Sequence, residues 1–170
     1  MEHQIIRNER NIDPVDLIRD IGNIAMFNPE QLAFFNAVNA AILNPLPGQS
    51  KLFFLDGPGG SGKSFTYNGL LAYHRSQNRI ALAVGSSGIA ACILQKGKTA
   101  HSVFGIPLEL RKDSTSSITV NSARAQLIRK ASLIIWDEAP MHHNNGFYVV
   151  DRLLKDIMKS EEQYYFIFHS

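Results

Sequence analysis

The sequence has one cysteine, no long apolar run and no excess of charge of either sign. The single Cys92, in the apolar stretch IAACIL, excludes an intramolecular disulfide framework and is typical of a reducing intracellular compartment. No apolar run approaches the about 20 residues that cross a bilayer, and the first residues lack the apolar core of a signal peptide. We therefore expect a soluble intracellular protein with no membrane partner.

Net charge and chain length exclude fewer classes of protein than the cysteine count and the hydropathy do. With 17 Lys and Arg against 15 Asp and Glu, the formal charge of +2 is far from the basic composition that by itself indicates a nucleic-acid binder. Charge therefore neither supports nor excludes DNA. A chain of 170 residues, 45% of them hydrophobic, can bury one sizeable core but is too short for two ordinary domains.

Two helix-start signals precede the most apolar part of the sequence. Asp13 and Pro14 are typical of an N-cap and a first helical residue. Asn28 and Gln31 have the spacing of a capping box, and they predict a helix over 30–43.

Short apolar runs separated by helix-length segments follow. The runs lie at 52–56, 79–84 and 132–137. Helices are predicted at 63–76, 88–95, 122–130 and 146–159. Such alternation is typical of strands buried on both faces, and it predicts a three-layer α/β domain with a mainly parallel sheet.

A glycine-rich segment, GPGGSGKS, follows the first apolar run. Gly57 and the triplet Gly62, Lys63 and Ser64 satisfy GxxxxGK[ST], between a predicted strand and a predicted helix. Glycines let backbone N–H groups turn toward a phosphate, Lys63 can reach the β and γ oxygens, and Ser64 can ligate Mg²⁺. The alternative is an ordinary strand-to-helix turn with a solvated lysine. The predicted ATP-binding loop comprises Gly57, Gly59, Gly60, Ser61, Gly62, Lys63 and Ser64.

The same glycines also fit the dinucleotide-binding pattern GxGxxG. That fold requires an acidic residue about 20 positions further on, at the end of the second strand, to hold the ribose. Here the second run ends in Val84, Gly85 and Ser86, with no carboxylate. A nicotinamide-binding fold is therefore excluded.

Adjacent carboxylates, Asp137 and Glu138, end the third apolar run, where α/β sheets place their ligands. Asp137 can hold Mg²⁺, usually through water, and Glu138 can orient and deprotonate an attacking water. Small-molecule P-loop kinases do not need that glutamate, because their nucleophile is the substrate. The pair thus favours hydrolysis, with a helix-capping carboxylate pair as the alternative.

Five ordered segments resemble the Pif (petite integration frequency) family of superfamily 1 DNA helicases. They are FNPEQLAFFNAV, FFLDGPGGSGKSF, ALAVGSSGIAACIL, GKTAHSVFGIPL and LIIWDEAPM, and the last is similar to the branch that includes Helitron-associated helicases. The resemblance covers roughly residues 26–158. It implies a RecA-like first motor lobe that hydrolyses ATP to move 5′ to 3′ along single-stranded DNA. It divides the chain into an N-terminal helical segment (1–25), the motor lobe (26–160) and an atypical tail (161–170).

The resemblance also implies roles for single residues. Gln31 reads the adenine edge, in addition to its capping role, and Lys63 and Glu138 are catalytic. Ser64 and Asp137 hold the metal.

Two more segments match those that meet DNA in this family. Ser86, Ser87 and Gly88 follow the second strand, where hydroxyls can donate to a phosphate, or else form an ordinary turn. His101 and Ser102 belong to a THS-like segment near the DNA path, with an interior histidine as the alternative.

Three further residues with aromatic rings are candidates for base stacking or metal binding. Phe104 is either a base-stacking platform or a core residue. His142 and His143 are adjacent, so on an extended strand they face opposite ways, and we assign them no metal.

After the last predicted helix, the resemblance implies a strand and a GDxxQ motif, and the sequence instead reads EEQYYFIFHS. We therefore expect a C-terminally truncated lobe whose ATP site needs a second lobe or a partner to supply arginines, which contribute about 10³ to 10⁵ in rate. Such a lobe does not unwind DNA alone. The segment YYFIF is expected to form an edge strand or an exposed apolar tail.

Two alternatives stay open, a small P-loop nucleotide or metabolite kinase and a non-enzymatic, decayed helicase fragment. The expected location is the nucleus, with the mitochondrion as the alternative. DNA repair, recombination, telomere maintenance and transposition are not distinguished by motor chemistry.

Overall fold

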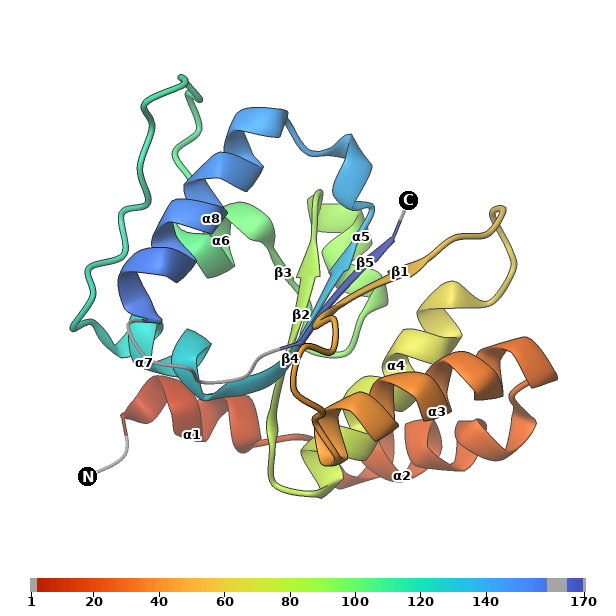
Figure 1. Cartoon of the computed structure of the whole chain (residues 1–170). Helices are drawn as coiled ribbons and strands as arrows, with labels where there is room; N and C mark the ends of the chain where they lie inside the picture. Colours follow the sequence, from red (N-terminus) through yellow and green to blue (C-terminus); the bar gives the residue numbers. More distant parts are fainter. Residues whose placement is uncertain (1–2, 159–164, 170) are drawn as a thin grey trace.

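A parallel sheet forms the centre of the molecule, in a computed structural model that describes residues 3–158 and 165–169. Its five strands lie in the order β1-β5-β4-β2-β3, with helices on both faces (Figure 1). They are β1 (Leu52–Leu55), β2 (Ile80–Gly85), β3 (Lys98–Thr99), β4 (Ala131–Asp137) and β5 (Tyr165–His169). All neighbouring strands are parallel. The expected three-layer α/β architecture is confirmed.

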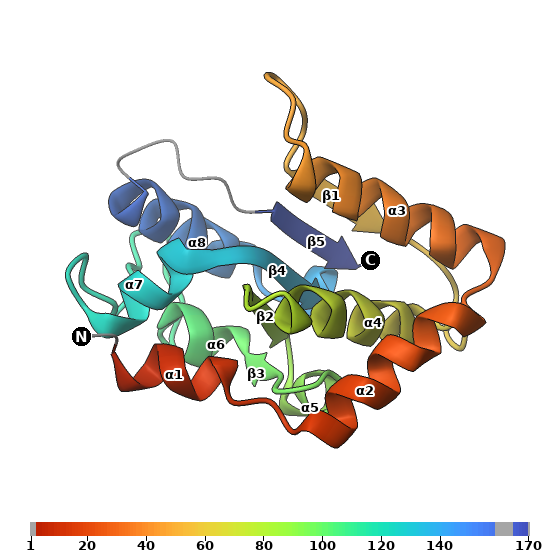
Figure 2. The same ribbon diagram turned by 90° about the horizontal axis from the view of Figure 1, so that it is seen from below.

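The helices divide between the two faces of the sheet (Figure 2). One face carries α2 (Pro14–Asn23), α3 (Pro29–Leu43) and α4 (Lys63–Ser76), and the other carries α1 (Gln4–Arg10), α6 (Ala100–Phe104), α7 (Ala123–Lys130) and α8 (Asn144–Ile157). The short α5 (Gly88–Ile93), η1 (Ile24–Met26) and η2 (Ala139–Met141) complete the described helices. The predicted helix over 63–76 coincides with α4, and the described ends of α5, α7 and α8 lie within two residues of the predictions. Residue 159, the predicted end of the last helix, lies outside the described residues.

Both helix starts read from the sequence are present. The Asp13 carboxylate accepts a hydrogen bond from the Val15 N–H at 2.8 Å, at the start of α2. At the start of α3, the Gln31 N–H donates to Asn28 Oδ1 at 2.9 Å, and the Asn28 N–H donates to Gln31 Oε1 at 3.0 Å. This reciprocal capping box holds the amino end of α3 in place.

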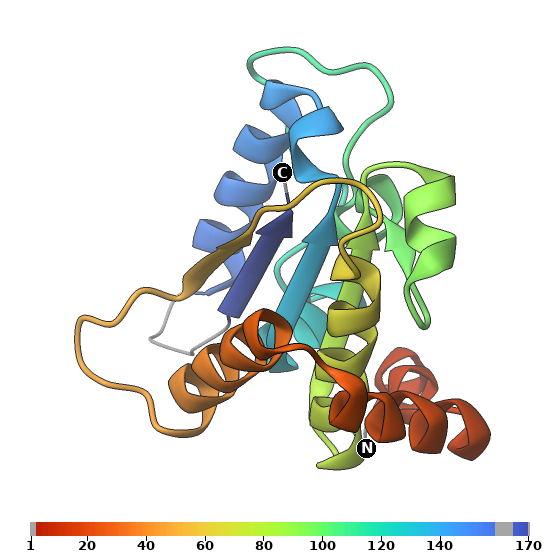
Figure 3. The ribbon, with the colours of Figure 1, turned by 90° about the vertical axis from the view of Figure 1, so that its right-hand side faces the viewer.

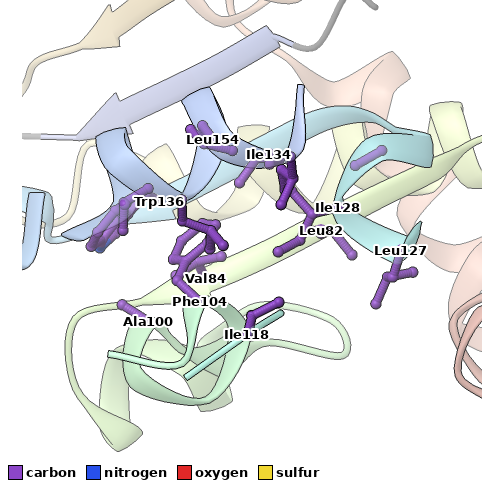
Figure 4. Close-up of a cluster of buried hydrophobic side chains, with 14 of the residues drawn as sticks. Leu82, Val84, Ala100, Phe104, Ile118, Leu127, Ile128, Ile134, Trp136 and Leu154 are labelled. Carbon is purple, nitrogen blue, oxygen red and sulfur yellow. The ribbon is translucent and has the colours of Figure 1, made fainter. Parts of the chain in front are cut away.

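Two hydrophobic cores lie on opposite faces of the sheet, and alternate residues of each central strand contribute to one or the other, because successive side chains point to opposite faces. In β4, Ile134 and Trp136 point to the core beneath α6, α7 and α8, where they lie near Phe104 (Figure 4). Leu133 and Ile135 point to the core beneath α3 and α4. All four side chains are fully buried, so β4 contributes to the hydrophobic core on both faces of the sheet.

The strand β5 contradicts the prediction for the end of the sequence. It lies between β1 and β4, so it is an interior strand and neither an edge strand nor an exposed tail. Phe166 and Ile167 are 2% and 0% exposed, and they contribute to the cores on opposite faces. The physical reason is that β1 and β4 do not pair with each other. A strand that pairs with both of them has a neighbour on each side and is covered on both faces, so its side chains are buried. Residues 161–164 of the expected tail lie outside the described residues.

The N-terminal segment packs against the rest of the domain. In α1, which lies in the segment 1–25 expected to be helical but has no start signal of its own in the sequence, Ile6 is 1% exposed, and the buried Glu9 carboxylate forms an ion pair with Lys98. Lys96 donates to two backbone carbonyls of the same segment, those of Asn8 and Asn11. Among the described residues, no helix combines the length and the apolar character needed to cross a membrane.

Candidate nucleotide-binding site

The loop between β1 and α4 has the backbone of a phosphate-binding loop. It passes from the carboxyl end of β1 to the first turn of α4 (Figure 3). Gly60 and Gly62 have φ angles of +79° and +81°, in the left-handed region that glycine enters without a steric penalty. Residues 57–62 thereby end at the amino terminus of a long helix, where free N–H groups and the helix dipole favour an anion.

The Lys63 ammonium lies inside this loop. It donates to the Gly57 carbonyl, to the Pro58 carbonyl at 2.9 Å and to Ser61 Oγ at 3.4 Å. The side chain thus turns back over the residues that precede it, and its charge lies within the concave face of the loop.

Gln31 connects the start of α3 to the same loop. Its Nε2 lies 3.4 Å from the carbonyl oxygens of Ser61 and Gly62. A Cβ atom on Gly62 would lie 2.4 Å from that nitrogen, so the amide fits only because position 62 has no side chain. Gln31 therefore caps its helix and contacts the P-loop at once, and its contact with adenine stays a prediction.

Asp137 lies at the carboxyl end of β4 and is 5% exposed. Its Oδ1 accepts a hydrogen bond from the Glu138 N–H at 3.0 Å. Burial, together with the negative charge of Asp137, raises the pKa of Tyr67. Ser64 lies in the first turn of α4, just after the carboxyl end of β1, and both β1 and β4 are parallel to β5, so their carboxyl ends lie at the same edge. The structure thus brings the two predicted metal ligands to one edge of the sheet.

Glu138 has an unusual backbone conformation. Its φ and ψ angles are 54° and 36°, in the left-handed region that non-glycine residues seldom adopt. The Asp137 carboxylate fixes its N–H, and its carbonyl accepts from the Met141 N–H at 3.0 Å to begin η2. Such conformations cost roughly 1–3 kcal/mol and cluster at functional sites. Nothing in the sequence indicates this geometry.

The segment Ser86 to Gly88 follows β2 at the same edge of the sheet. The Ser87 hydroxyl accepts from the Ala90 N–H at 3.2 Å and caps α5, as the turn interpretation predicts. The Ser86 hydroxyl accepts from Trp136 Nε1 at 3.0 Å. Ser87 and Gly88 are exposed, and their contact with DNA stays a prediction.

His101 and Ser102 begin α6. His101 is half-buried, and Ser102 is exposed, with its carbonyl accepting from Arg124. Phe104, in contrast, is fully buried, with its ring centre 5.3 Å from that of Trp136. The interpretation of Phe104 as a base-stacking platform is wrong, because its ring fills the core beneath β4 (Figure 4).

The two adjacent histidines have different environments. His143 caps α8 by accepting from the Asn145 N–H at 3.1 Å. His142 is buried, and its ring contacts those of His101, Trp136 and Phe147. Burial, with the nearby charges of His101 and His143, lowers the pKa of His142. Sequence reasoning missed this ring contact because it joins segments far apart in the chain.

The carboxyl ends of β1, β4 and β2 therefore carry a phosphate-binding loop, two adjacent carboxylates and a polar turn along one edge of a parallel sheet. This arrangement defines a P-loop NTPase lobe of the RecA-like type. The PIF1-like helicase family matches residues 26–167, and the chain belongs to that family. The match extends past residue 160, near which the resemblance was expected to end.

Known relatives agree with this assignment. The chain is 30% identical over 118 residues to the ATP-dependent DNA helicase Pif1 of Psychrobacter sp. (strain PRwf-1), covering 67% of this chain and 18% of that helicase. It is 33% identical over 110 residues to the ATP-dependent DNA helicase Pif1 of Campylobacter jejuni, covering 61% and 24%. The chain thus spans less than a quarter of either helicase.

Solved structures confirm the fold. Bacteroides Pif1 bound to single-stranded DNA has a TM-score of 0.66 at 22% identity, covering 84% of this chain and 31% of that one. Pif1 helicase from Candida albicans has a TM-score of 0.64 at 18% identity, covering 85% and 32%. The described lobe corresponds to about a third of each of these chains.

Proposed function

We propose that this chain is the first motor lobe of an ATP-dependent DNA helicase that moves 5′ to 3′ along single-stranded DNA. The observation that carries the proposal is the placement of the P-loop and of Asp137 and Glu138 on one edge of the sheet. The curated relatives are ATP-dependent DNA helicases, which supports the same activity for a larger assembly that contains this lobe.

In this proposal, the P-loop holds the phosphates of ATP. The Lys63 ammonium lies beside the Gly57 and Pro58 carbonyls, and the β and γ oxygens would replace these weaker acceptors. The Ser64 hydroxyl and the buried Asp137 carboxylate are the oxygen ligands that Mg²⁺ prefers. Mg²⁺ bound with ATP neutralises the charge that develops on the phosphates.

Glu138 supplies the base for hydrolysis. Its left-handed backbone turns the chain at the end of β4, directly after the proposed metal ligand. A carboxylate in this place can orient a water and accept its proton during in-line attack on the γ-phosphate. This role favours hydrolysis over transfer to a small metabolite. Arginines from a second lobe or a partner would complete the site, so the lobe alone should turn over slowly.

Single-stranded DNA is the proposed partner of the segments beside the site. Ser86, Ser87 and Gly88 lie at the carboxyl end of β2, and His101 and Ser102 lie at the start of α6. Hydroxyl and imidazole groups can donate to backbone phosphates without reading sequence. Bacteroides Pif1 has been crystallised with single-stranded DNA, and also with ADP-AlF3 and single-stranded DNA. We place this activity inside the cell, in the nucleus or alternatively in the mitochondrion.

Calorimetry tests the nucleotide part of the proposal. Wild-type chain should bind ATP in the presence of Mg²⁺, and Lys63→Ala should weaken binding at least tenfold, equivalent to about 1.4 kcal/mol. Lys155→Ala is the matched control, because that side chain is 73% exposed and pairs only with Asp151 on α8 among the described residues. No binding by the wild-type chain at millimolar ATP would refute the proposal.

A further inference from the structure

Trp136, the only tryptophan in the chain, joins the nucleotide site to the first proposed DNA segment. It directly precedes Asp137 and is 0% exposed. Its Nε1 donates to Ser86 Oγ at 3.0 Å, and the Ser86 N–H donates to the Asp137 carbonyl at 3.2 Å. Ser86 is thus attached to the end of β4 through both its side chain and its backbone.

His142 extends this connection to the second proposed DNA segment. It follows Glu138 across η2, where its N–H donates to the Ala139 carbonyl at 3.0 Å. Its ring centre lies 5.4 Å from that of Trp136 and 5.1 Å from that of His101. The imidazole therefore lies against both the β4 tryptophan and the start of α6.

Close packing fixes the position of the His142 ring. The side chain is 7% exposed, and its Nε2 has no hydrogen-bond partner among residues 3–158 and 165–169. A Cβ atom on Gly146 would lie 2.2 Å from that nitrogen, so the ring rests directly on the backbone of α8. A ring held on all sides by packing transmits the displacement of one neighbour to the others, because a close-packed interior has little free space.

We infer that Trp136 and His142 are positioning residues that couple nucleotide binding to DNA binding. The inference rests on the proposed function. Movement of the Asp137–Glu138 turn when nucleotide binds would shift the Trp136 indole and η2, and with them Ser86 and His101. Linkage requires the reverse effect of equal size, so DNA binding would change the affinity for nucleotide by the same factor.

Three variants separate coupling from simple support of the core, and one of them, His142→Leu, removes the ring contacts with Trp136 and His101. Trp136→Phe keeps an aromatic ring but removes the donor of the hydrogen bond to Ser86. Ser86→Ala removes the acceptor of the same bond and leaves the indole in place. Leu153→Met is the control, because Leu153 is 3% exposed in the same core but lies on α8 about two turns after Gly146, where the His142 ring rests.

The experiment measures the affinity for ATP with Mg²⁺, by calorimetry, in the absence and presence of saturating oligo-dT. In wild-type chain the two affinities should differ by at least fivefold, within the usual range for coupled sites. The ratio should fall toward one in Trp136→Phe, in Ser86→Ala and in His142→Leu, and stay unchanged in Leu153→Met. Because Trp136 is the sole indole, its emission should also respond to oligo-dT in wild type and lose that response in Ser86→Ala.

The outcomes distinguish the inference from the function on which it rests. If wild-type chain binds no ATP or no oligo-dT, the proposed function fails. If it binds both ligands independently, or if its coupling survives in Ser86→Ala and Trp136→Phe, the inference is overturned. Ser86 is half-buried, so we expect Ser86→Ala to stay folded, as circular dichroism would check, and to test the hydrogen bond where a core variant does not fold.

Discussion

Three glycines of the P-loop, replaced one at a time by alanine, test why the loop has its conformation. Gly59 has open space around an added Cβ atom and no positive φ. Gly60 has equally open space but a φ of +79°. Gly62 has a φ of +81°, and its Cβ would lie 2.4 Å from Gln31 Nε2. The series therefore separates backbone strain from a collision with the amide of α3.

The expected free energies of unfolding follow from these differences. Gly59→Ala should be neutral or stabilising by roughly 0.4–1 kcal/mol, because alanine restricts the unfolded chain. Gly60→Ala should destabilise by about 1–2 kcal/mol, the cost of a left-handed non-glycine residue. Gly62→Ala has the same backbone cost and also loses the two Gln31 contacts with the loop, each worth about 0.5–1.5 kcal/mol, for a total of about 2–5 kcal/mol.

Urea unfolding, followed by circular dichroism, measures the three variants. Gln31→Ala should cost less in the Gly62→Ala background than in wild type, because the contacts with the loop are already lost there, whereas in the Gly60→Ala background it should cost the full amount. ATP affinity should fall in the same order as stability. Equal free energies for all three alanine variants, or no interaction between positions 31 and 62, would refute this account of the loop.

Three further predictions concern the rest of the domain. Burial, reinforced by the charge of Arg79, lowers the pKa of His74 to about 4. The unfolded state therefore binds the extra proton first as pH falls, and about 3 kcal/mol of stability should be lost between pH 6.5 and pH 4, with a shallower loss in His74→Gln by urea unfolding. Ile167→Ala, at a fully buried position of β5, should cost about 2–5 kcal/mol and lower the unfolding midpoint, whereas the exposed Ile89→Ala should not. Glu9→Gln removes the buried partner of Lys98, so limited proteolysis should cut the α1 segment faster than in the exposed control Glu109→Gln.

Local features of the site could be predicted from the sequence. The P-loop, the start of α4 at Lys63 and the caps at Asp13 and Asn28 each depend on neighbouring residues, and all are present in the structure. Asp137 likewise lies at the end of a buried strand, as the apolar run before it indicates. Short-range signals sufficed because capping and loop geometry involve contacts within a few residues.

The remaining features depend on contacts between distant segments. Nothing in YYFIF says that β1 and β4 leave a gap for it, and the two-residue β3 is too short to produce a pattern. Phe104 has the same apolar neighbours whether it faces DNA or Trp136, so only the packing of α6 under β4 decides its role. The left-handed backbone of Glu138 is set by Asp137 and η2 together.

The interior position of β5 has a consequence for how the domain forms on the ribosome. Among the described strands, β1 pairs with β5 alone, and β5 is the last of them to be synthesised. Until residues 165–169 emerge, the P-loop strand has no neighbour in the sheet, and both β1 and β4 expose an unpaired edge. Such non-local parallel pairing is slow, and its folding intermediates expose hydrophobic surfaces and unpaired strand edges that promote aggregation. The nucleotide site would therefore be the last part of this sheet to assemble, at the step where a chaperone would have most effect.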